Sequence, residues 1–353
     1  MPRARDLGIR IGSLPTGPTN SVLDVEGVGL GHATVHRDEP LVARTGVSCL
    51  VLAEDAYLRP VPAGGAVLNG AGECTGFITA QEWASAETPV YLTSTMQLGR
   101  VYDAACEIAL EAHAEVADDV IIPIVGECDD SYLNDCRRMH VTADDVRAAH
   151  AAALASRGSS TAPDEGAVGG GTGMSCLGFK GGIGTSSRVT AEGHTVAVLL
   201  MTNFGARSEL TVAGVPVGRL LEDRWSSLSR PSEPEKPAGS CIGIVVTDAP
   251  VDGASCARLA RRVGLGLARA GSVAHHGSGE IFMAFGTGMR LDRDQRADVV
   301  PLSGRGIDPL FQAVVEATEE AVLNSMFTAP TTVGRDGHSS ESLHSPAVLD
   351  LLR

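Results

Sequence analysis

A change of composition at a Gly-Ser pair is the feature that most restricts how this chain can fold. The segment Ser232–Pro237 is polar and proline-rich, whereas Cys241–Thr247, two residues after Gly239, is an apolar run rich in β-branched residues. Such a run, bounded by a polar segment, predicts a buried strand. Ser240 therefore lies at the point where a polar linker enters the core.

A serine at that junction becomes a reactive group if the chain is cut directly before it. If the peptide bond between Gly239 and Ser240 breaks, Ser240 carries both a hydroxyl and an α-amine. The ordinary pKa of an α-amine is about 7.7–8.0, so near neutrality part of it is unprotonated and can act as the base that activates the hydroxyl. Glycine before the serine tolerates strained backbone and leaves its carbonyl open to attack. The alternative is an ordinary loop that enters a core strand.

Polar groups stand at the ends of two further apolar runs. Gly277–Glu280 precedes Ile281–Phe285, and the run Leu199–Thr202 ends at Asn203, whose side-chain amide is a suitable donor for an oxyanion hole. The glycine-rich segments Gly166–Met174 and Gly181–Arg188 frame another hairpin.

Together with Arg3–Ile9, these segments resemble the family of L-aminopeptidase/D-amidase-esterases and β-peptidyl aminopeptidases. The resemblance extends to Thr331–His338 and so covers nearly the whole chain. Its most specific parts are the glycine-rich block and the segment from Gly239 to Pro250. It implies an α+β fold, namely a four-layer αββα sandwich of the N-terminal-nucleophile-hydrolase type, in a self-cleaving hydrolase.

The resemblance also implies roles for individual residues. Ser240 corresponds to the nucleophile, Ser278 and Glu280 to the serine and glutamate beside it, and Asn203 to the oxyanion donor. Tyr132 lies where the family has an active-site tyrosine that binds substrate, although the local spacing matches less closely. The alternatives are turn residues for Ser278, Glu280 and Asn203, and an exposed loop residue for Tyr132.

The activity that follows from the resemblance is release of N-terminal amino acids from small peptides, amides or esters through an acyl-enzyme on Ser240. We expect one domain, residues 1–353, cut between Gly239 and Ser240 into chains 1–239 and 240–353. Two alternatives stay open: an acyltransferase that uses the same acyl-enzyme, and an uncut, non-catalytic binding protein. The preference for L-α-, D-α- or β-amino acids is also open.

Composition restricts the kinds of molecule to which this protein is expected to bind. The net charge of −15 argues against a nucleic-acid or anionic membrane surface, and no apolar run reaches the length of about 18 residues that a membrane span needs. The N-terminus shows no apolar signal region, and the eight cysteines form no CxxC pair, so we expect a cytoplasmic protein with reduced cysteines. The resemblance implies a homo-oligomer, a tetramer of αβ units.

We expect no metal and no cofactor. The pair His275-His276 lacks the spacing of metal ligands, and adjacent side chains on an extended segment point in opposite directions. The run Gly169–Gly173 is not followed by the Gly-Lys-Ser/Thr of a phosphate loop. We interpret it as a structural turn near the site.

Strands interleaved with amphipathic helices indicate layered packing of helices on sheets. A linker is expected at Arg224–Gly239. The predicted helices are Gly99–Asp118, Thr142–Arg157, Asp252–Ala270 and one that starts at Asp308, and the predicted strands are Val47–Ala53, Asp119–Val125, Met174–Lys180, Gly182–Val189, Thr195–Asn203, Cys241–Thr247 and Glu280–Phe285.

Overall fold

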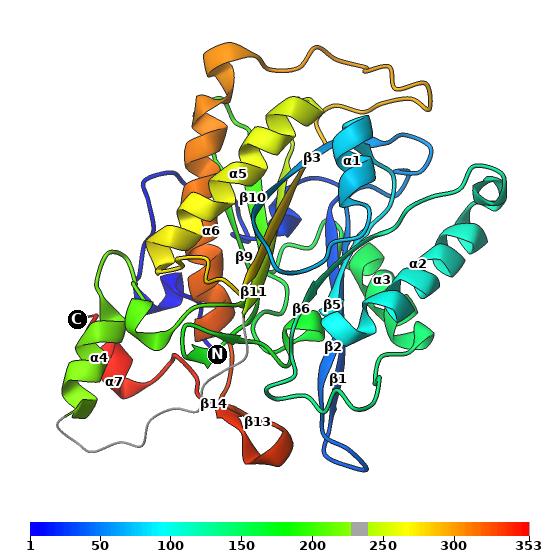
Figure 1. Ribbon diagram of the computed structural model, residues 1–353. Helices are drawn as coiled ribbons and strands as arrows, with labels where there is room; N and C mark the ends of the chain where they lie inside the picture. Colours follow the sequence, from blue (N-terminus) through cyan, green and yellow to red (C-terminus); the bar gives the residue numbers. More distant parts are fainter. Residues whose placement is uncertain (227–238, 353) are drawn as a thin grey trace.

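Two β-sheets pack face to face and helices cover both outer faces (Figure 1). A computed structural model describes residues 1–226 and 239–352. One sheet has the strand order β1-β2-β5-β6 and the other β4-β3-β12-β11-β10-β9. Helices α2 and α3 pack on the first sheet, and α5 and α6 pack on the second. The predicted four-layer αββα sandwich is confirmed.

The elements have the following bounds. The strands are β1 (Gly29–Arg37), β2 (Ala43–Val51), β3 (Val61–Gly70), β4 (Ser85–Ala86), β5 (Val90–Ser94), β6 (Ile124–Cys128), β7 (Ser175–Cys176), β8 (Phe179–Lys180), β9 (Gly182–Val189), β10 (Thr195–Asn203), β11 (Ser240–Thr247), β12 (Gly279–Gly286), β13 (Thr332–Val333) and β14 (Ser339–Ser340). The α-helices are α1 (Phe77–Trp83), α2 (Leu98–Ala112), α3 (Ala143–Ser156), α4 (Val217–Ser226), α5 (Gly253–Ala270), α6 (Asp308–Phe327) and α7 (Pro346–Leu349).

Strand β11 shows how the pleat divides side chains between the layers. Ile242 and Ile244 belong to the apolar core between the two sheets. Cys241 and Val245 belong to the core between the six-stranded sheet and the helices α5 and α6. Because successive side chains of a strand point to opposite faces, Ser240 shares the inter-sheet face with Ile242.

Several predicted elements are confirmed. Strands β9 and β10 have the predicted bounds, and Thr142 caps α3 by accepting a hydrogen bond from the Asp145 backbone N–H. Helix α5 begins after the N-cap Asp252, and α6 begins at Asp308 with proline in its first turn.

Other predictions need correction. The helix expected over Gly99–Asp118 ends at Ala112, and the strand expected over Asp119–Val125 starts only at Ile124, directly after Pro123. Proline has no backbone N–H to donate to a strand ladder, so pairing begins beyond it.

The strand predicted over Met174–Lys180 is a tight hairpin of β7 and β8. Leu177 and Gly178 have positive φ angles of 48° and 74°. The chain reverses direction at these two residues, between β7 and β8. Most of the linker predicted at Arg224–Gly239 lies outside the described residues.

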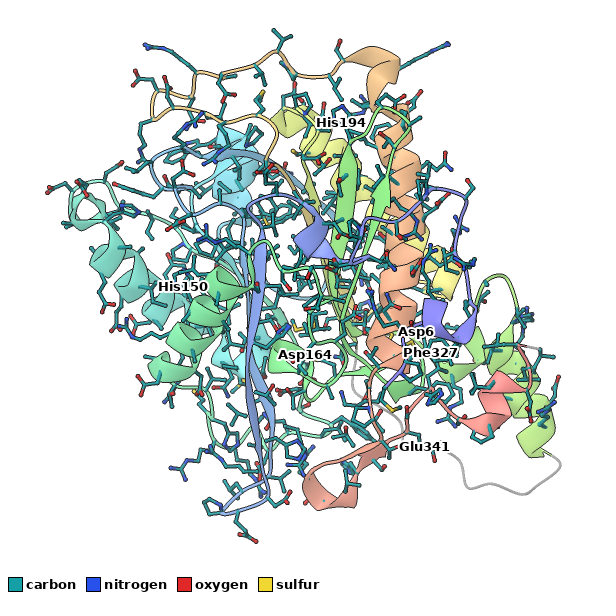
Figure 2. The ribbon with its side chains drawn as sticks, turned by 180° about the vertical axis from the view of Figure 1, so that it is seen from behind. Asp6, His150, Asp164, His194, Phe327 and Glu341 are labelled. Atoms are coloured by element: carbon teal, nitrogen blue, oxygen red, sulfur yellow. The ribbon has the colours of Figure 1, made fainter. Side chains whose placement is uncertain are left out.

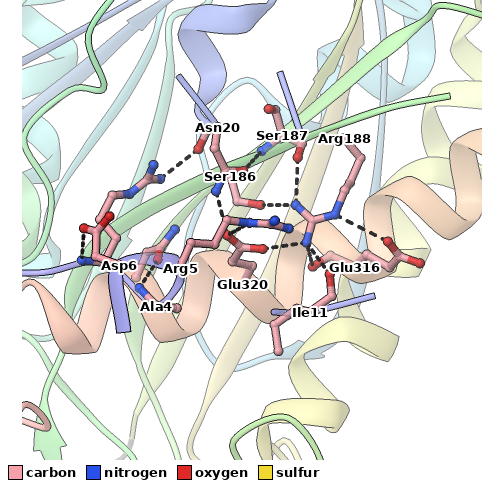
Figure 3. Close-up of polar contacts among 12 residues, drawn as sticks. Ala4, Arg5, Asp6, Ile11, Asn20, Ser186, Ser187, Arg188, Glu316 and Glu320 are labelled. Atoms are coloured by element: carbon pink, nitrogen blue, oxygen red, sulfur yellow. Dashed lines mark hydrogen bonds and ion pairs between the residues drawn. The ribbon is translucent and has the colours of Figure 1, made fainter. Parts of the chain in front are cut away.

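Helix α6 carries buried charges that its apolar pattern did not suggest. Arg188 on β9 has a fully buried side chain and donates to Glu320 Oε2 at 2.7 Å and to Glu316 Oε2 at 3.4 Å (Figure 3). Arg5, near the N-terminus, donates to Glu320 Oε1 at 2.8 Å. These ion pairs connect the N-terminal segment and β9 to α6. The last residue of α6, Phe327, lies on the opposite side of the two sheets from His150 on α3 (Figure 2).

We predict that Arg188→Met lowers the free energy of unfolding by about 3–5 kcal/mol, because it leaves the buried Glu316 carboxylate without its cation and removes one of the two cations that contact Glu320. Urea unfolding at neutral pH measures the effect. The matched control is Arg59→Met, which breaks the exposed ion pair with Asp298 and should cost less than about 1 kcal/mol. Equal losses in the two variants would contradict a stabilising role for the buried network.

No helix within residues 1–226 and 239–352 combines the length and apolarity needed to cross a membrane.

Candidate active site

Ser240 is the first residue of β11 and only 4% of its surface is exposed. In the sheet it pairs with Asn203 at the end of β10 and with Gly279 at the start of β12. The Gly279 backbone N–H donates to the Gly239 carbonyl at 3.2 Å. The bond between Gly239 and Ser240 is therefore held between two neighbouring strands.

Only glycine fits before the serine. A Cβ atom at Gly239 would lie 2.3 Å from the carbonyl oxygen of Asn203 and 2.8 Å from the Cα of Phe204. Both distances fall below what real side chains show, and both neighbours are backbone atoms that cannot rotate away. Close approach to β10 thus adds a steric reason for glycine to the conformational one expected from the sequence.

The Ser240 and Asn203 side chains share one face of the sheet. Paired residues of antiparallel strands point to the same side, here toward β6 of the opposite sheet. Burial raises the pKa of the Cys128 thiol on β6, and the nearby Ser240 hydroxyl opposes that shift. Within the described part of the chain, the buried Ser240 Oγ has no hydrogen-bond partner of good geometry. A buried hydroxyl without a partner needs an explanation, and a catalytic role is one.

Two hydrogen bonds fix the orientation of the Asn203 amide. Its Oδ1 accepts from the Ser175 backbone N–H at 2.9 Å, and its Nδ2 donates to the Asp129 carbonyl at 2.8 Å. A primary amide has two N–H donors, so one remains beyond the bond to Asp129. Because the Asn203 side chain shares a face with the Ser240 hydroxyl, this donor belongs to that face of the sheet.

Ser278 and Glu280 form a second polar group beside Ser240. The Ser278 hydroxyl donates to Glu280 Oε1, and Glu280 Oε2 is buried without a partner among the described residues. Burial raises the pKa of Glu280, and the hydrogen bond from Ser278 opposes this shift. Glu280 pairs with Cys241, whose side chain faces α5 and α6. By strand alternation, Glu280 and the Ser240 hydroxyl therefore belong to opposite faces.

Tyr132 lies on the loop that follows β6. Its ring stacks on the His338 ring with centroids 4.7 Å apart, and its hydroxyl donates to the Ser339 carbonyl at 3.4 Å. The Asp129 carbonyl on the same loop accepts the hydrogen bond from Asn203, so this loop is in contact with the end of β10. The structure thus brings Ser240, Asn203, Ser278 and Glu280 together at one strand end and places Tyr132 on an adjoining loop.

Glu127 on β6 is a candidate that the sequence reasoning missed. It is 4% exposed, and its carboxylate accepts from the Glu73 backbone N–H at 2.8 Å and from the Thr95 hydroxyl. Burial raises its pKa. Across residues 1–226 and 239–352, no cationic side chain forms an ion pair with it. The available signal was a glutamate inside an apolar strand run.

Glu127 lies near the start of β12, the strand that pairs with β11. A Cβ atom at Gly72 would be 3.1 Å from Glu127 Oε1 and 3.5 Å from the Cα of Gly279, the strand partner of Ser240. A buried carboxylate without a cation, near the first residue of β12, is suited to receive an ammonium group.

The described residues contain no group of three or more His, Cys, Asp or Glu side chains that could hold a metal ion. His275 instead contacts Glu209, with Nε2 2.8 Å from Oε1.

Known proteins resemble this chain in sequence and in fold. Residues 20–340 match the model of peptidase family S58. A β-peptidyl aminopeptidase, BapA, of Sphingosinicella microcystinivorans is 34% identical over 97% of this chain and 89% of its own length. A solved β-aminopeptidase from Burkholderia sp. is 38% identical, with a TM-score of 0.89 over 100% of this chain and 98% of that one.

A third relative identifies the type of fold. The L-aminopeptidase D-Ala-esterase/amidase of Ochrobactrum anthropi, described as a variant of the Ntn hydrolase fold, is 34% identical with a TM-score of 0.88 over 100% of this chain and 98% of that one. Fold and relatives together define a serine hydrolase of the Ntn type. The chain belongs to peptidase family S58. The predicted resemblance and the aminopeptidase class of hydrolase are confirmed.

The loop that holds Asn203 is anchored by the buried carboxylate of Asp130. It accepts from the Ser94 hydroxyl at 2.8 Å, the Asn134 amide at 3.1 Å and the Cys136 thiol at 3.3 Å. Burial raises the pKa of Asp130 from its ordinary value of 3.8 to about 6.

This shift predicts a pH-dependent contribution to stability. Between about pH 4 and 6 the folded state retains the Asp130 proton while the unfolded state releases it, so this contribution falls as pH rises. Asp130→Asn cannot ionise. Its free energy of unfolding, relative to wild type, should therefore improve by up to about 1.4 kcal/mol per pH unit in that window.

Urea unfolding across that pH range provides the test, with Asp298→Asn as the exposed control. Asp298→Asn should keep a constant difference from wild type in free energy of unfolding across this pH range. If Asp130→Asn also keeps a constant difference, Asp130 does not titrate as described.

Proposed function

We propose that this protein is a self-processing aminopeptidase in which Ser240 first cuts the chain and then attacks the substrate. The observation that carries the proposal is the sheet register that pairs a buried Ser240 with both Asn203 and Gly279. The active form is one domain made of chains 1–239 and 240–353. Its substrates are small peptides, amides or esters with an unblocked amine.

In the processing step, Ser240 Oγ attacks the Gly239 carbonyl carbon. The C–N bond to Ser240 breaks, its nitrogen leaves as an amine, and the Gly239 acyl group passes to the hydroxyl as an ester. Water then hydrolyses the ester. The hydrogen bond from the Gly279 N–H to the Gly239 carbonyl oxygen supports this step, because it polarises the carbonyl under attack.

After processing, the new α-amine takes the role of base. It accepts the proton of the Ser240 hydroxyl as that hydroxyl attacks the substrate carbonyl, and it returns the proton to the leaving amine or alcohol. Water then hydrolyses the acyl-enzyme to free acid and hydroxyl.

Glu280 acts through the amine, since its register places it on the face opposite the hydroxyl. Its unpartnered Oε2 is suited to accept a hydrogen bond from the ammonium form, and Ser278 fixes the other carboxylate oxygen.

Asn203, Glu127 and Tyr132 are the residues that contact the substrate in this proposal. The Asn203 N–H stabilises the oxyanion, and the carboxylate of Glu127 receives the substrate ammonium, which raises specificity for an unblocked N-terminus. Tyr132 and His338 form an aromatic surface beside the loop of Asp129. The relatives' names include β-peptidyl and L-amino-acid substrates and a D-Ala ester or amide, and these define the substrate panel to assay.

The proposal includes a cytoplasmic homo-oligomer without nucleic-acid or membrane partners. The net charge of −15 supports the lack of a surface for polyanions, and the resemblance of the sequence supports the oligomer.

Ser240→Ala should leave a single uncut chain and abolish hydrolysis, because both steps need the hydroxyl. Denaturing electrophoresis and intact mass measurement report the cut. Ser339→Ala, an exposed serine in the C-terminal segment, is the control and should yield fragments 1–239 and 240–353. Purified Ser240→Ala protein that is still cut at this bond would rule out self-processing by Ser240.

Asn203→Ala should lower kcat by roughly 10²–10³-fold with little change in KM, because an oxyanion donor acts chiefly in the transition state. Turnover is measured on the processed fraction alone, since processing passes through its own tetrahedral intermediate and should slow as well. A processed variant with near-normal kcat would remove Asn203 from the site.

A further inference from the structure

Lys180 at the end of β8 has a fully buried side chain. Its Nζ donates to three backbone carbonyl oxygens, those of Gly171 at 3.1 Å, Met174 at 2.8 Å and Gly181 at 2.8 Å. An ammonium group has three N–H donors, one for each of these carbonyls. The lysine joins the two glycine-rich segments that the sequence singles out.

Two of these carbonyls, those of Gly171 and Met174, belong to a segment whose glycines pack closely against neighbouring backbone. Gly170 packs against the Leu92 carbonyl and Gly171 against the Ile183 backbone nitrogen, where Cβ atoms would lie 2.6 Å and 2.4 Å from these atoms. Three carbonyl dipoles directed at one point repel each other unless a cation sits between them. The Lys180 ammonium supplies that charge.

One of these carbonyls leads directly to the oxyanion donor. The Met174 carbonyl and the Ser175 N–H belong to the same peptide group, which is planar and rigid. Lys180 donates to the carbonyl oxygen of this peptide group, and the Ser175 N–H of the same group donates to Asn203 Oδ1 at 2.9 Å. A cation at the oxygen strengthens the N–H as a donor, since hydrogen bonds in a chain polarise one another.

We propose that Lys180 is a positioning residue for catalysis. Through the peptide group between Met174 and Ser175, it holds the Asn203 amide in the orientation that presents an N–H to the oxyanion. This role rests on the proposed function, in which Asn203 is the oxyanion donor. Lys180 itself touches no reacting atom.

The test replaces Lys180 with Met, which keeps most of the apolar stem and removes the ammonium. In the processed enzyme we expect kcat to fall about tenfold or more, part of the loss expected for a whole oxyanion donor, with KM within about twofold of wild type. In an Asn203→Ala background the same replacement should leave kcat nearly unchanged, because the two residues act as a unit.

Hydrogen exchange at the Ser175 amide gives a readout that does not depend on activity. Lys180→Met should speed this exchange, whereas Val198→Ala, a core change on β10, should not alter it beyond its effect on global stability. If the wild type hydrolyses no substrate, the proposed function fails, yet the exchange still reports whether Lys180 anchors the peptide group.

Three results would overturn the proposal. They are a normal kcat in Lys180→Met, an equal fold-loss in the Asn203→Ala background, and an unchanged exchange rate at Ser175. If Lys180→Met does not fold, Lys180→Gln, which keeps N–H donors but removes the charge, is measured in the same way. A Lys180→Gln enzyme with normal kcat and an unchanged exchange rate at Ser175 would overturn the role proposed for the ammonium charge.

Discussion

The pairing of Ser240 with β10 on one side and β12 on the other is the constraint on which the rest of the site depends. It presses Gly239 against the backbone of β10, where no side chain fits, and it brings the Gly279 N–H to the Gly239 carbonyl. The same register puts the Asn203 amide beside the Ser240 hydroxyl. A shift of one residue would turn the hydroxyl to the other face and separate it from the Asn203 amide.

The pleat of β11 also divides the proposed catalytic groups between the two faces of the sheet. The hydroxyl and the Asn203 amide face the opposite sheet, whereas Glu280 pairs with Cys241 on the side of α5 and α6. The backbone nitrogen of Ser240 lies between these faces. In the proposed mechanism, an α-amine at that nitrogen links the carboxylate to the hydroxyl, which explains why such an enzyme would need to be cut before it hydrolyses substrate.

The sequence predicted the parts of this arrangement that local patterns encode. The apolar run after Gly239, the asparagine that ends β10 and the polar segment before β12 all lie at strand ends, and the family resemblance assigned them to one site. The buried contacts of Glu127 and Lys180 were beyond such reasoning. The Glu127 carboxylate accepts from Glu73, which is distant in sequence, and the Lys180 ammonium contacts carbonyls that only the folded glycine-rich turn brings together. No periodicity in the sequence reports either set of contacts. The hairpin of β7 and β8 was missed because the positive φ of Leu177 is imposed by the fold rather than by residue type.

The central claim is that the Ser240 side chain carries the acyl group in a chain whose N-terminus is Ser240. Trapping with a slowly hydrolysed amino-acid ester, acid quench and mass mapping of the fragments test it most directly. We expect one acyl group on the Ser240 oxygen of fragment 240–353, with the α-amine unmodified. An acyl group found on any other side chain, or on Ser240 in an uncut chain, would contradict the claim.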